Sequence, residues 1–356
     1  MQIRFNDQDW ERITQDWTGF WHQDLDQPMV WIQIWDPSKE PIPGRKSFMA
    51  QYPLQLSPEE IIELETRHLE GFDFIGDAFP KLFVNFGAGS AAAYFGAIPK
   101  VEPTTVWFDP MNFDLQYIKL AINRTGEWYQ RIHAILDAAL ARWQDKVQVS
   151  NTDIGGNLDI LASLRGTEQL LIDCYEQPEW VAGLCKQITT YWLQIYQEEA
   201  DKILKVCRGT SPWAPVFSQG YTYMLQSDFS YMISPQMFER FVMPDLCTCC
   251  DFLDDPFYHL DGKGQLNHLD MLCSIKKLKG IQWGPGAGQP EAEEWPEVIH
   301  KIRAADKLCW VVVSPEGALR IKNEFGGKGF IFSIYSETRT LTLNEANELY
   351  RELIRS

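Results

Sequence analysis

The sequence predicts an α/β protein and, within that class, a (β/α)8 barrel with N-terminal helical additions. In the C-terminal half, short apolar runs alternate with longer amphipathic runs, and strands recur about every 20 to 30 residues with one helix between them. The length of 356 residues suits one such barrel. An open doubly wound sheet is the alternative, but it usually carries a Gly-rich turn after its first strand, and none follows here. We expect a single domain over 1–356, with 1–25 as an N-terminal extension.

The strands are predicted from short apolar runs, beginning with the buried run over 28–35. The helices are predicted from amphipathic periodicity and start signals; for example, Ser57 is a candidate N-cap that precedes Pro58 and two acids. The expected strands are 28–35, 71–79, 147–152, 215–218, 257–260, 280–283, 308–313 and 329–335. Two helices are expected to begin at 57 and at 234. The other expected helices cover 112–146, 167–206, 265–274, 291–304, 315–325 and 343–354.

The charge of the chain excludes several classes of partner. The sequence has 32 Lys and Arg against 49 Asp and Glu, a net charge of −17, so it lacks the basic footprint of a nucleic-acid-binding protein and would be repelled by anionic lipids. No apolar stretch is long enough to span a membrane, and the first residues lack the apolar region of a signal peptide. The 8 cysteines show no disulfide framework. We therefore expect a cytoplasmic protein.

In a parallel barrel the chemistry lies at the carboxyl ends of the strands. The predicted strand ends alone therefore indicate which residues should line a pocket, independently of any sequence motif. Those carried forward as candidates are Asp77, Asp153, Gln219, Tyr221, His259, Asp261, Gln282, Trp283, Glu316 and Tyr335.

The sharpest local signal is His259-Leu260-Asp261-Gly262. Side chains two apart on a strand point the same way, so His259 and Asp261 could bind Zn²⁺ or form an acid/base pair. A hydrogen-bonded pair that only shapes the loop is the structural alternative.

These residues belong to a wider pattern that resembles the uroporphyrinogen decarboxylase superfamily, including its cobalamin-dependent methyltransferase branch. The match covers most of the chain after residue 25. Four pieces carry it: 228–244 with Ser234-Pro235, the segment His259-Leu260-Asp261-Gly262, Val84-Asn85-Phe86-Gly87 followed by Tyr94-Phe95-Gly96, and Leu164-Arg165-Gly166 with Pro178-Glu179. The resemblance implies a (β/α)8 barrel, in agreement with the strand pattern.

The departures from the family pattern bear on the activity. The arginine pair with which true decarboxylases hold substrate carboxylates is missing from 26–35, and their essential Asp is matched by Asn85. A porphyrinogen with many carboxylates is also a poor substrate for so acidic a protein. The methyltransferase branch binds zinc through His-x-Cys and a distant Cys. Here Asp261 replaces the first Cys, and 332–336 contains no Cys, so Glu316 is the candidate third ligand beside His259 and Asp261.

The resemblance therefore implies a corrinoid-dependent methyltransferase that moves a methyl group between a small-molecule substrate and cobalamin, carried on a partner corrinoid protein or bound at the barrel mouth. His259 and Asp261 would hold zinc or handle protons. The pocket would be lined by Asp77, Asn85, Asp153, Gln219, Tyr221, Gln282, Trp283 and Tyr335. A decarboxylase of uroporphyrinogen III or of another acid, and a non-catalytic ligand-binding homologue, are the alternatives.

Overall fold

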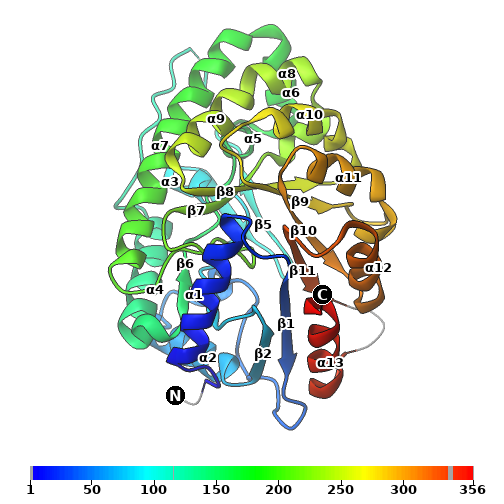
Figure 1. Ribbon diagram of the computed structural model, residues 1–356. Helices are drawn as coiled ribbons and strands as arrows, with labels where there is room; N and C mark the ends of the chain where they lie inside the picture. The colour runs from blue at the N-terminus through cyan, green and yellow to red at the C-terminus, as the bar shows by residue number, and fades with distance from the viewer. Residues whose placement is uncertain (1–2, 115, 336–339, 356) are drawn as a thin grey trace.

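The computed structural model describes residues 3–114, 116–335 and 340–355. It is an α/β protein with a mainly parallel sheet of seven strands in the order β2-β1-β11-β10-β9-β8-β7 (Figure 1). Every neighbouring pair is parallel except β1 and β2. The strands are β1 (Met29–Trp35), β2 (Phe72–Gly76), β7 (Thr222–Gln226), β8 (Asp255–Asp261), β9 (Gly280–Gly284), β10 (Leu308–Val313) and β11 (Phe330–Ile334).

Two further pairs of strands lie outside this sheet. β3 (Lys81–Phe83) and β6 (Gln148–Ser150) pair with each other in parallel, and β4 (Ile98–Val101) and β5 (Val106–Asp109) form an antiparallel hairpin. Within the described residues, no ladder joins β3 to β1 or β6 to β7. The observed pairing is therefore a seven-stranded sheet and a separate parallel pair.

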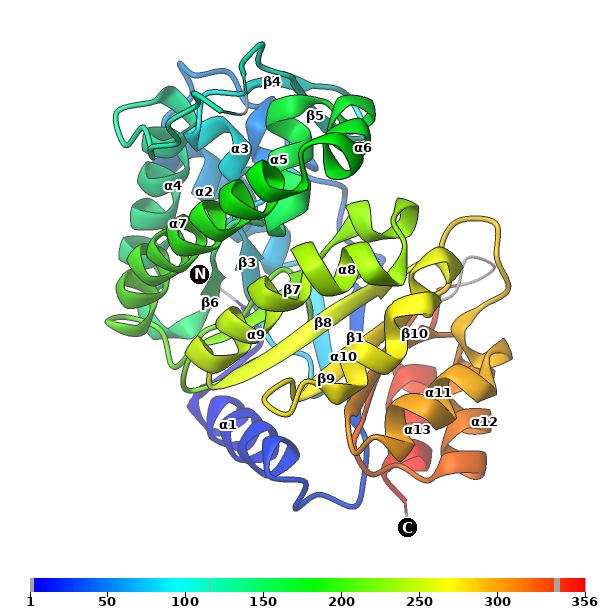
Figure 2. The same cartoon turned by 90° about the horizontal axis from the view of Figure 1, so that it is seen from above.

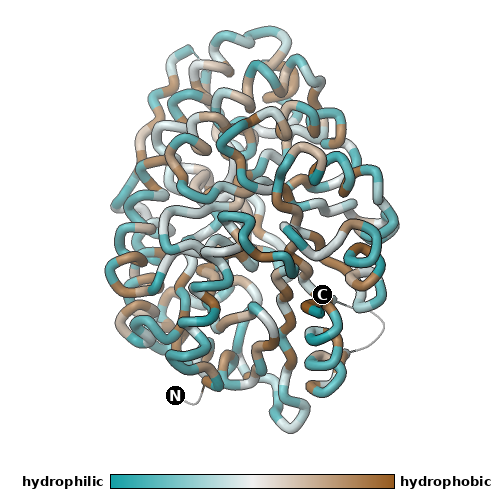
Figure 3. The backbone as a smooth tube through the Cα atoms, in the orientation of Figure 1, coloured by the Kyte–Doolittle hydropathy of each residue, from teal (hydrophilic) through white to brown (hydrophobic). Residues whose placement is uncertain are grey.

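Helices surround the strands, and Figure 2 shows α1 and the β4–β5 hairpin on opposite sides of them. Hydrophobic segments are concentrated along the central strands, whereas the outer helices alternate between hydrophilic and hydrophobic segments (Figure 3). The α-helices are α1 (Asp7–Trp21), α2 (Pro58–Leu69), α3 (Ala91–Tyr94), α4 (Glu127–Trp143), α5 (Asn157–Arg165), α6 (Thr167–Glu176), α7 (Pro178–Leu204), α8 (Pro235–Phe241), α9 (Met243–Phe252), α10 (Leu269–Ser274), α11 (Pro296–Ala304), α12 (Pro315–Phe325) and α13 (Leu343–Ile354).

The strands separate two hydrophobic cores. Side chains alternate between the two faces of a strand, so Tyr258 and Trp283 belong to the core beneath the outer helices. On the other face, Phe257, Leu308 and Ile331 belong to a second core that includes the apolar residues of α1. The second core lies towards the amino ends of the strands, beneath α1, and polar side chains are left at the carboxyl ends.

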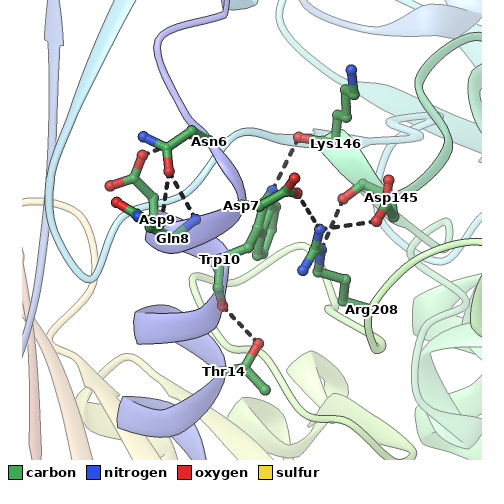
Figure 4. A network of polar contacts seen from close by, with 9 residues as sticks. All are labelled: Asn6, Asp7, Gln8, Asp9, Trp10, Thr14, Asp145, Lys146 and Arg208. Atoms are coloured by element: carbon green, nitrogen blue, oxygen red, sulfur yellow. Dashed lines mark hydrogen bonds and ion pairs between the residues drawn. The ribbon is translucent and has the colours of Figure 1, made fainter.

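Helix α1 covers the amino ends of the strands through Trp10, Trp17 and other buried side chains. Asn6 caps the helix by accepting hydrogen bonds from the Gln8 and Asp9 backbone at 2.8 and 3.2 Å (Figure 4). The Trp10 indole donates to the Lys146 carbonyl at 3.2 Å, and Arg208 pairs with Asp7 at 2.6 Å. The predicted N-terminal addition is thus a helix anchored to the short turn before β6 and to the segment after α7.

The prediction of an α/β protein with a mainly parallel sheet is confirmed. Complete closure as a barrel stays a prediction. Among the described residues, no helix is long and apolar enough to cross a membrane.

Several expected elements were wrong in extent or direction, and the helix expected over 167–206 is divided at Gln177 into α6 and α7. The strand expected over 71–79 is β2, which runs antiparallel to β1, and the next parallel strand, β3, begins only at Lys81. No strand forms over 215–218, and the parallel strand in this part of the chain, β7, begins only at Thr222. Pro212 and Pro215 donate no backbone hydrogen bond and suit an irregular segment better than a central strand. The helix expected over 112–146 is shorter, because α4 begins only after Gly126.

Candidate active site

Polar side chains meet in a cavity of about 300 Å³ at the carboxyl ends of the parallel strands. We call this cavity the acid pocket, because Asp153 follows β6 and Asp228 follows β7. Its lining consists of Phe48, Phe83, Asn85, Gly87, Ala88, Asp153, Trp213, Gln226, Asp228 and His259.

Asp153 is the most deeply buried acid of the pocket, with 7% of its surface exposed. Its side chain accepts a hydrogen bond from the Gly155 backbone at 3.0 Å, and the Tyr223 hydroxyl donates to it at 3.4 Å. Burial raises the pKa of Asp153 to about 7, and the hydrogen bond from Gly155 only partly opposes this shift. Near neutral pH the group is therefore divided between a carboxylic acid and a carboxylate, as a general acid requires.

Hydrogen bonds with residues outside the pocket hold the loop that carries Asp153 in place. The Ser90 backbone and hydroxyl both donate to the Asp153 carbonyl, at 2.8 and 2.7 Å. The Thr152 backbone donates at 3.0 Å to Glu199 of α7, a carboxyl that is completely buried. Burial raises the pKa of Glu199 to about 8, so this contact persists without a charge in the core. These contacts hold Asp153 in one position relative to the pocket.

Asp228 reaches the solvent at the pocket opening, yet protein surrounds most of its carboxyl group. Partial burial and the charges of Asp153 and Asp261 raise its pKa. The chain turns at this point because the Asp228 and Phe229 backbones donate to Asp159 at 3.1 and 2.8 Å. Burial, followed by the charge of Asp228, likewise raises the pKa of Asp159. These neighbouring carboxyls titrate as a group and share protons above the pH at which isolated acids ionise.

His259 enters the pocket from β8, beside Gln282 of β9. The His259 Nδ1 atom is hydrogen-bonded to the side-chain oxygen of Gln282, and the Trp213 ring lies edge-on to the imidazole at 5.0 Å between centroids. With the Gln282 oxygen assigned as the acceptor, Nδ1 carries the proton and Nε2 has a free lone pair. Burial lowers the pKa of His259, which favours the neutral imidazole.

The structure thus brings together four of the predicted residues: Asn85, Asp153 and His259 line the pocket, and Gln282 supports His259. The neighbouring predicted residue Trp283 lies on the outer face of β9. It is fully buried, and its ring packs against Trp295 at 5.5 Å between centroids, so it belongs to the core.

Three predicted residues lie at the opposite, amino end of the strands. Asp77 follows the antiparallel strand β2, where it accepts from the Val30 backbone at 2.7 Å and lies 3.5 Å from Arg12 of α1. Gln219 and Tyr221 precede β7, and their side chains contact Thr18 and Asp201. The assumed strand direction and boundary were wrong at these positions, so these residues are omitted from the proposed pocket.

The predicted zinc ligands do not form a set. Asp261 is exposed at the end of β8, and Glu316 is exposed in the first turn of α12. Across 3–114, 116–335 and 340–355, no group of three or more His, Cys, Asp or Glu side chains is arranged to hold a metal ion. Since the residues present do not fit a three-ligand zinc site, no step below depends on zinc. Tyr335 is 62% exposed after β11, and Ser336 lies outside the described residues.

Sequence reasoning missed the contributions of Gln226 and Glu199. The aromatic-rich tract 213–231 is a candidate pocket lining on the sequence alone, and its residues Trp213 and Asp228 line the acid pocket. Gln226 ends the strand whose position was misjudged, so the period-two pattern of 222–226 could have found it. Glu199 carried no usable signal, because its isolation in the core depends on the packing of α7 against the loop after β6.

No protein-family model matches the sequence, and no curated protein sequence matches it. Among solved structures, the chain is similar to a methyltransferase from Methanosarcina mazei, with a TM-score of 0.57 and 11% sequence identity. The match covers 84% of this chain and 85% of that chain. At this identity the likeness shows the fold alone.

We expect the Asp153→Asn variant to gain stability relative to the wild type as the pH rises. The folded-state pKa of Asp153, about 7, lies above the value of about 3.9 for an unfolded chain. The folded wild type therefore binds more protons between these values, and this contribution to its stability is lost as the pH rises through about 7. Asn cannot ionise, so the variant does not lose this stability as the pH rises. Urea unfolding at pH 5 and pH 8 measures the effect; an equal difference at both pH values would contradict it.

Proposed function

We propose that the protein is a methyltransferase-type enzyme of the uroporphyrinogen decarboxylase superfamily, in which Asp153 supplies a proton to the group that loses the methyl. The observation that carries this proposal is the acid pocket, where a buried carboxyl with a pKa of about 7 lies beside a second acid and a neutral histidine. Its position at the carboxyl ends of the strands is the usual place for chemistry in a barrel.

We infer that β3 and β6 complete an eight-stranded barrel with the parallel strands of the large sheet. The inward residues of the pair support this, because Lys81 and Phe83 of β3 line a cavity together with Trp31 of β1 and Ser333 of β11. The Gln148 side chain of β6 donates at 2.9 Å to the Gly209 carbonyl, in the segment before β7. A shared cavity on one side and one side-chain hydrogen bond on the other thus bridge the edges that backbone ladders leave open.

In the proposed reaction, a methyl group bound to a heteroatom of the substrate is transferred to a corrinoid. A corrinoid presented at the pocket would supply a reduced cobalt centre as the methyl acceptor, with the electron pair for the new bond to the methyl carbon. The heteroatom keeps the electron pair of the broken bond and takes a proton from Asp153, which becomes a carboxylate. Asp228, which is exposed to solvent, and His259, which lines the same pocket, return a proton from solvent to Asp153. Protonation of the leaving atom typically contributes 10²–10⁴ in rate.

The surroundings of the pocket suit a corrinoid presented by a partner protein. A second cavity, of about 520 Å³, shares Ala88, Gln226 and Asp228 with the acid pocket and extends below the β4–β5 hairpin. Its lining includes Trp107 and Met232, which are 64% and 47% exposed. Exposed apolar residues at an opening favour contact with a large apolar-faced group.

Decarboxylation of an organic acid is the second candidate, because the same carboxylic acid could protonate the carbanion left by loss of CO₂. No Arg or Lys lines the acid pocket among the described residues, so it offers no clamp for a porphyrinogen with many carboxylates.

Methyl transfer is tested with purified protein, reduced cobalamin and a panel of methyl donors that includes aryl methyl ethers, methyl thioethers and methylamines. We expect methylcobalamin to form with at least one donor and to persist when a metal chelator is present. Failure with every donor, or CO₂ release from an acid in place of methyl transfer, would reject the methyltransferase proposal. Turnover of uroporphyrinogen III would establish the decarboxylase instead.

A further inference from the structure

A third cavity, of about 410 Å³, adjoins the acid pocket on the side of β1 and β3. The two share Phe83, Asn85 and Trp213 in their walls, so a single ligand can occupy both. We call this third cavity the basic cavity, because Arg45, Lys46 and Lys81 line it.

Lys81 is partly buried and has no carboxylate to balance its charge, so burial lowers the pKa of its ammonium group well below the usual value. Its ammonium group donates to the Ser211 hydroxyl at 3.0 Å and to the carbonyls of Pro212, at 2.6 Å, and Ala214. All three acceptors are neutral, and none of the ion pairs among the described residues includes Lys81. The hydrogen-bonding capacity of the group is satisfied, but its charge has no counter-ion. A buried charge of this kind is costly and is normally paired.

Arg45 and Lys46 are the other two basic residues that line the basic cavity. The Arg45 Nε atom donates at 3.0 Å to Glu65, whose side chain is only 4% exposed, so this arginine is neutralised by a buried partner. Lys46 is exposed, and no carboxylate pairs with it in the part of the chain that the structure describes. Lys46, together with Lys81 in its protonated form, therefore gives the cavity an uncompensated positive charge, in a protein whose net charge is −17.

The remaining walls define what kind of anion fits. Trp31, Phe83 and Trp213 provide flat apolar surfaces, and Gln33 and Ser333 add polar groups from β1 and β11. Such a cavity suits an apolar or planar body that ends in an acid group. An anion of this kind would supply the missing counter-charge for Lys81.

We propose that the basic cavity binds a carboxylate of the substrate, so that the enzyme acts on a small organic acid whose reacting group lies in the acid pocket. This inference rests on the proposed function only in taking the acid pocket as the reacting centre. The carboxylate would lie near Lys46 and Lys81, and the apolar body between Trp31 and Trp213 would direct the other end of the molecule towards Asp153.

The test is equilibrium binding, measured by calorimetry, and requires no turnover. The probes are 3-phenylpropanoate and its neutral counterpart 3-phenylpropanamide. We expect the acid to bind at least about tenfold more tightly than the amide, and Lys46→Gln to weaken the acid about tenfold without weakening the amide. Arg67→Gln is the matched control, since it removes an exposed positive charge from α2 outside the cavity and should change neither affinity.

Lys81→Met tests the contribution of the Lys81 charge, and circular dichroism verifies that the variant is folded. The folded variant should bind the acid more weakly than the wild type does. Its affinity for the amide should equal that of the wild type. Equal binding of acid and amide, or of the acid to Lys46→Gln and Arg67→Gln, would overturn the proposal. Lys46-dependent binding of the acid without any methyl transfer would reject the proposed reaction and support the carboxylate site.

Discussion

Asp153→Asn is expected to slow methyl transfer about 10²–10⁴-fold, the usual contribution of a general acid. The amide is almost the same size as the acid and can still accept the hydrogen bonds from Gly155 and Tyr223, so the loop after β6 should keep its shape. It cannot give a proton to a leaving atom. The rate of methylcobalamin formation at saturating donor, compared between variant and wild type, measures the effect.

Asp77→Asn is the matched control for this prediction. Burial also raises the pKa of Asp77 to about 7, but its side chain lies beside Val30 and Arg12 at the amino end of the strands. The control should keep the wild-type rate after correction for the fraction folded. A folded Asp153→Asn protein as fast as the wild type would show that Asp153 is not the proton donor.

Trp17→Ala is expected to lower the free energy of unfolding by about 3–5 kcal/mol, the typical cost of deleting a large buried aromatic side chain. Only 1% of the surface of Trp17 is exposed, and the side chain packs against Phe20 and Trp21 in the core that α1 shares with the strands. Its replacement leaves a cavity at the amino ends of the strands. Urea unfolding monitored by far-UV circular dichroism measures the change.

Trp180→Ala serves as the control, because Trp180 is 47% exposed on α7 and its loss should change stability by no more than about 0.5 kcal/mol. If Trp17→Ala and Trp180→Ala unfold at the same urea concentration, α1 contributes little to the core, contrary to the packing described above.

The sequence predicted well where a strand is apolar, parallel and clearly bounded. β8 and β9 have these properties, and the predictions for His259 and Gln282 depended only on their strand ends and on alternation within the strand. The same alternation places Trp283 on the outer face, and only the three-dimensional packing against Trp295 shows that its ring fills the core.

The errors have physical causes. Nothing in 71–79 distinguishes a parallel strand from the antiparallel β2, because strand direction depends on partners distant in the sequence; Asp77 was therefore assigned to the wrong end. The run 215–218 is apolar because Val216 and Phe217 pack beneath α1, although they form no strand. The raised pKa values of Asp153 and Glu199 arise from burial by several elements, which composition and spacing do not encode.

The pH dependence of methyl transfer by the wild type is the most direct test of Asp153 as the proton donor. If Asp153 gives the proton, the rate at saturating donor and corrinoid should be constant at low pH and should fall about tenfold per pH unit above about 7, where the acid becomes a carboxylate. The residual rate of Asp153→Asn should lack this fall. A wild-type rate that is constant or rises from pH 6 to pH 9, or a fall of the same shape in Asp153→Asn, would contradict the assignment of Asp153 as the proton donor.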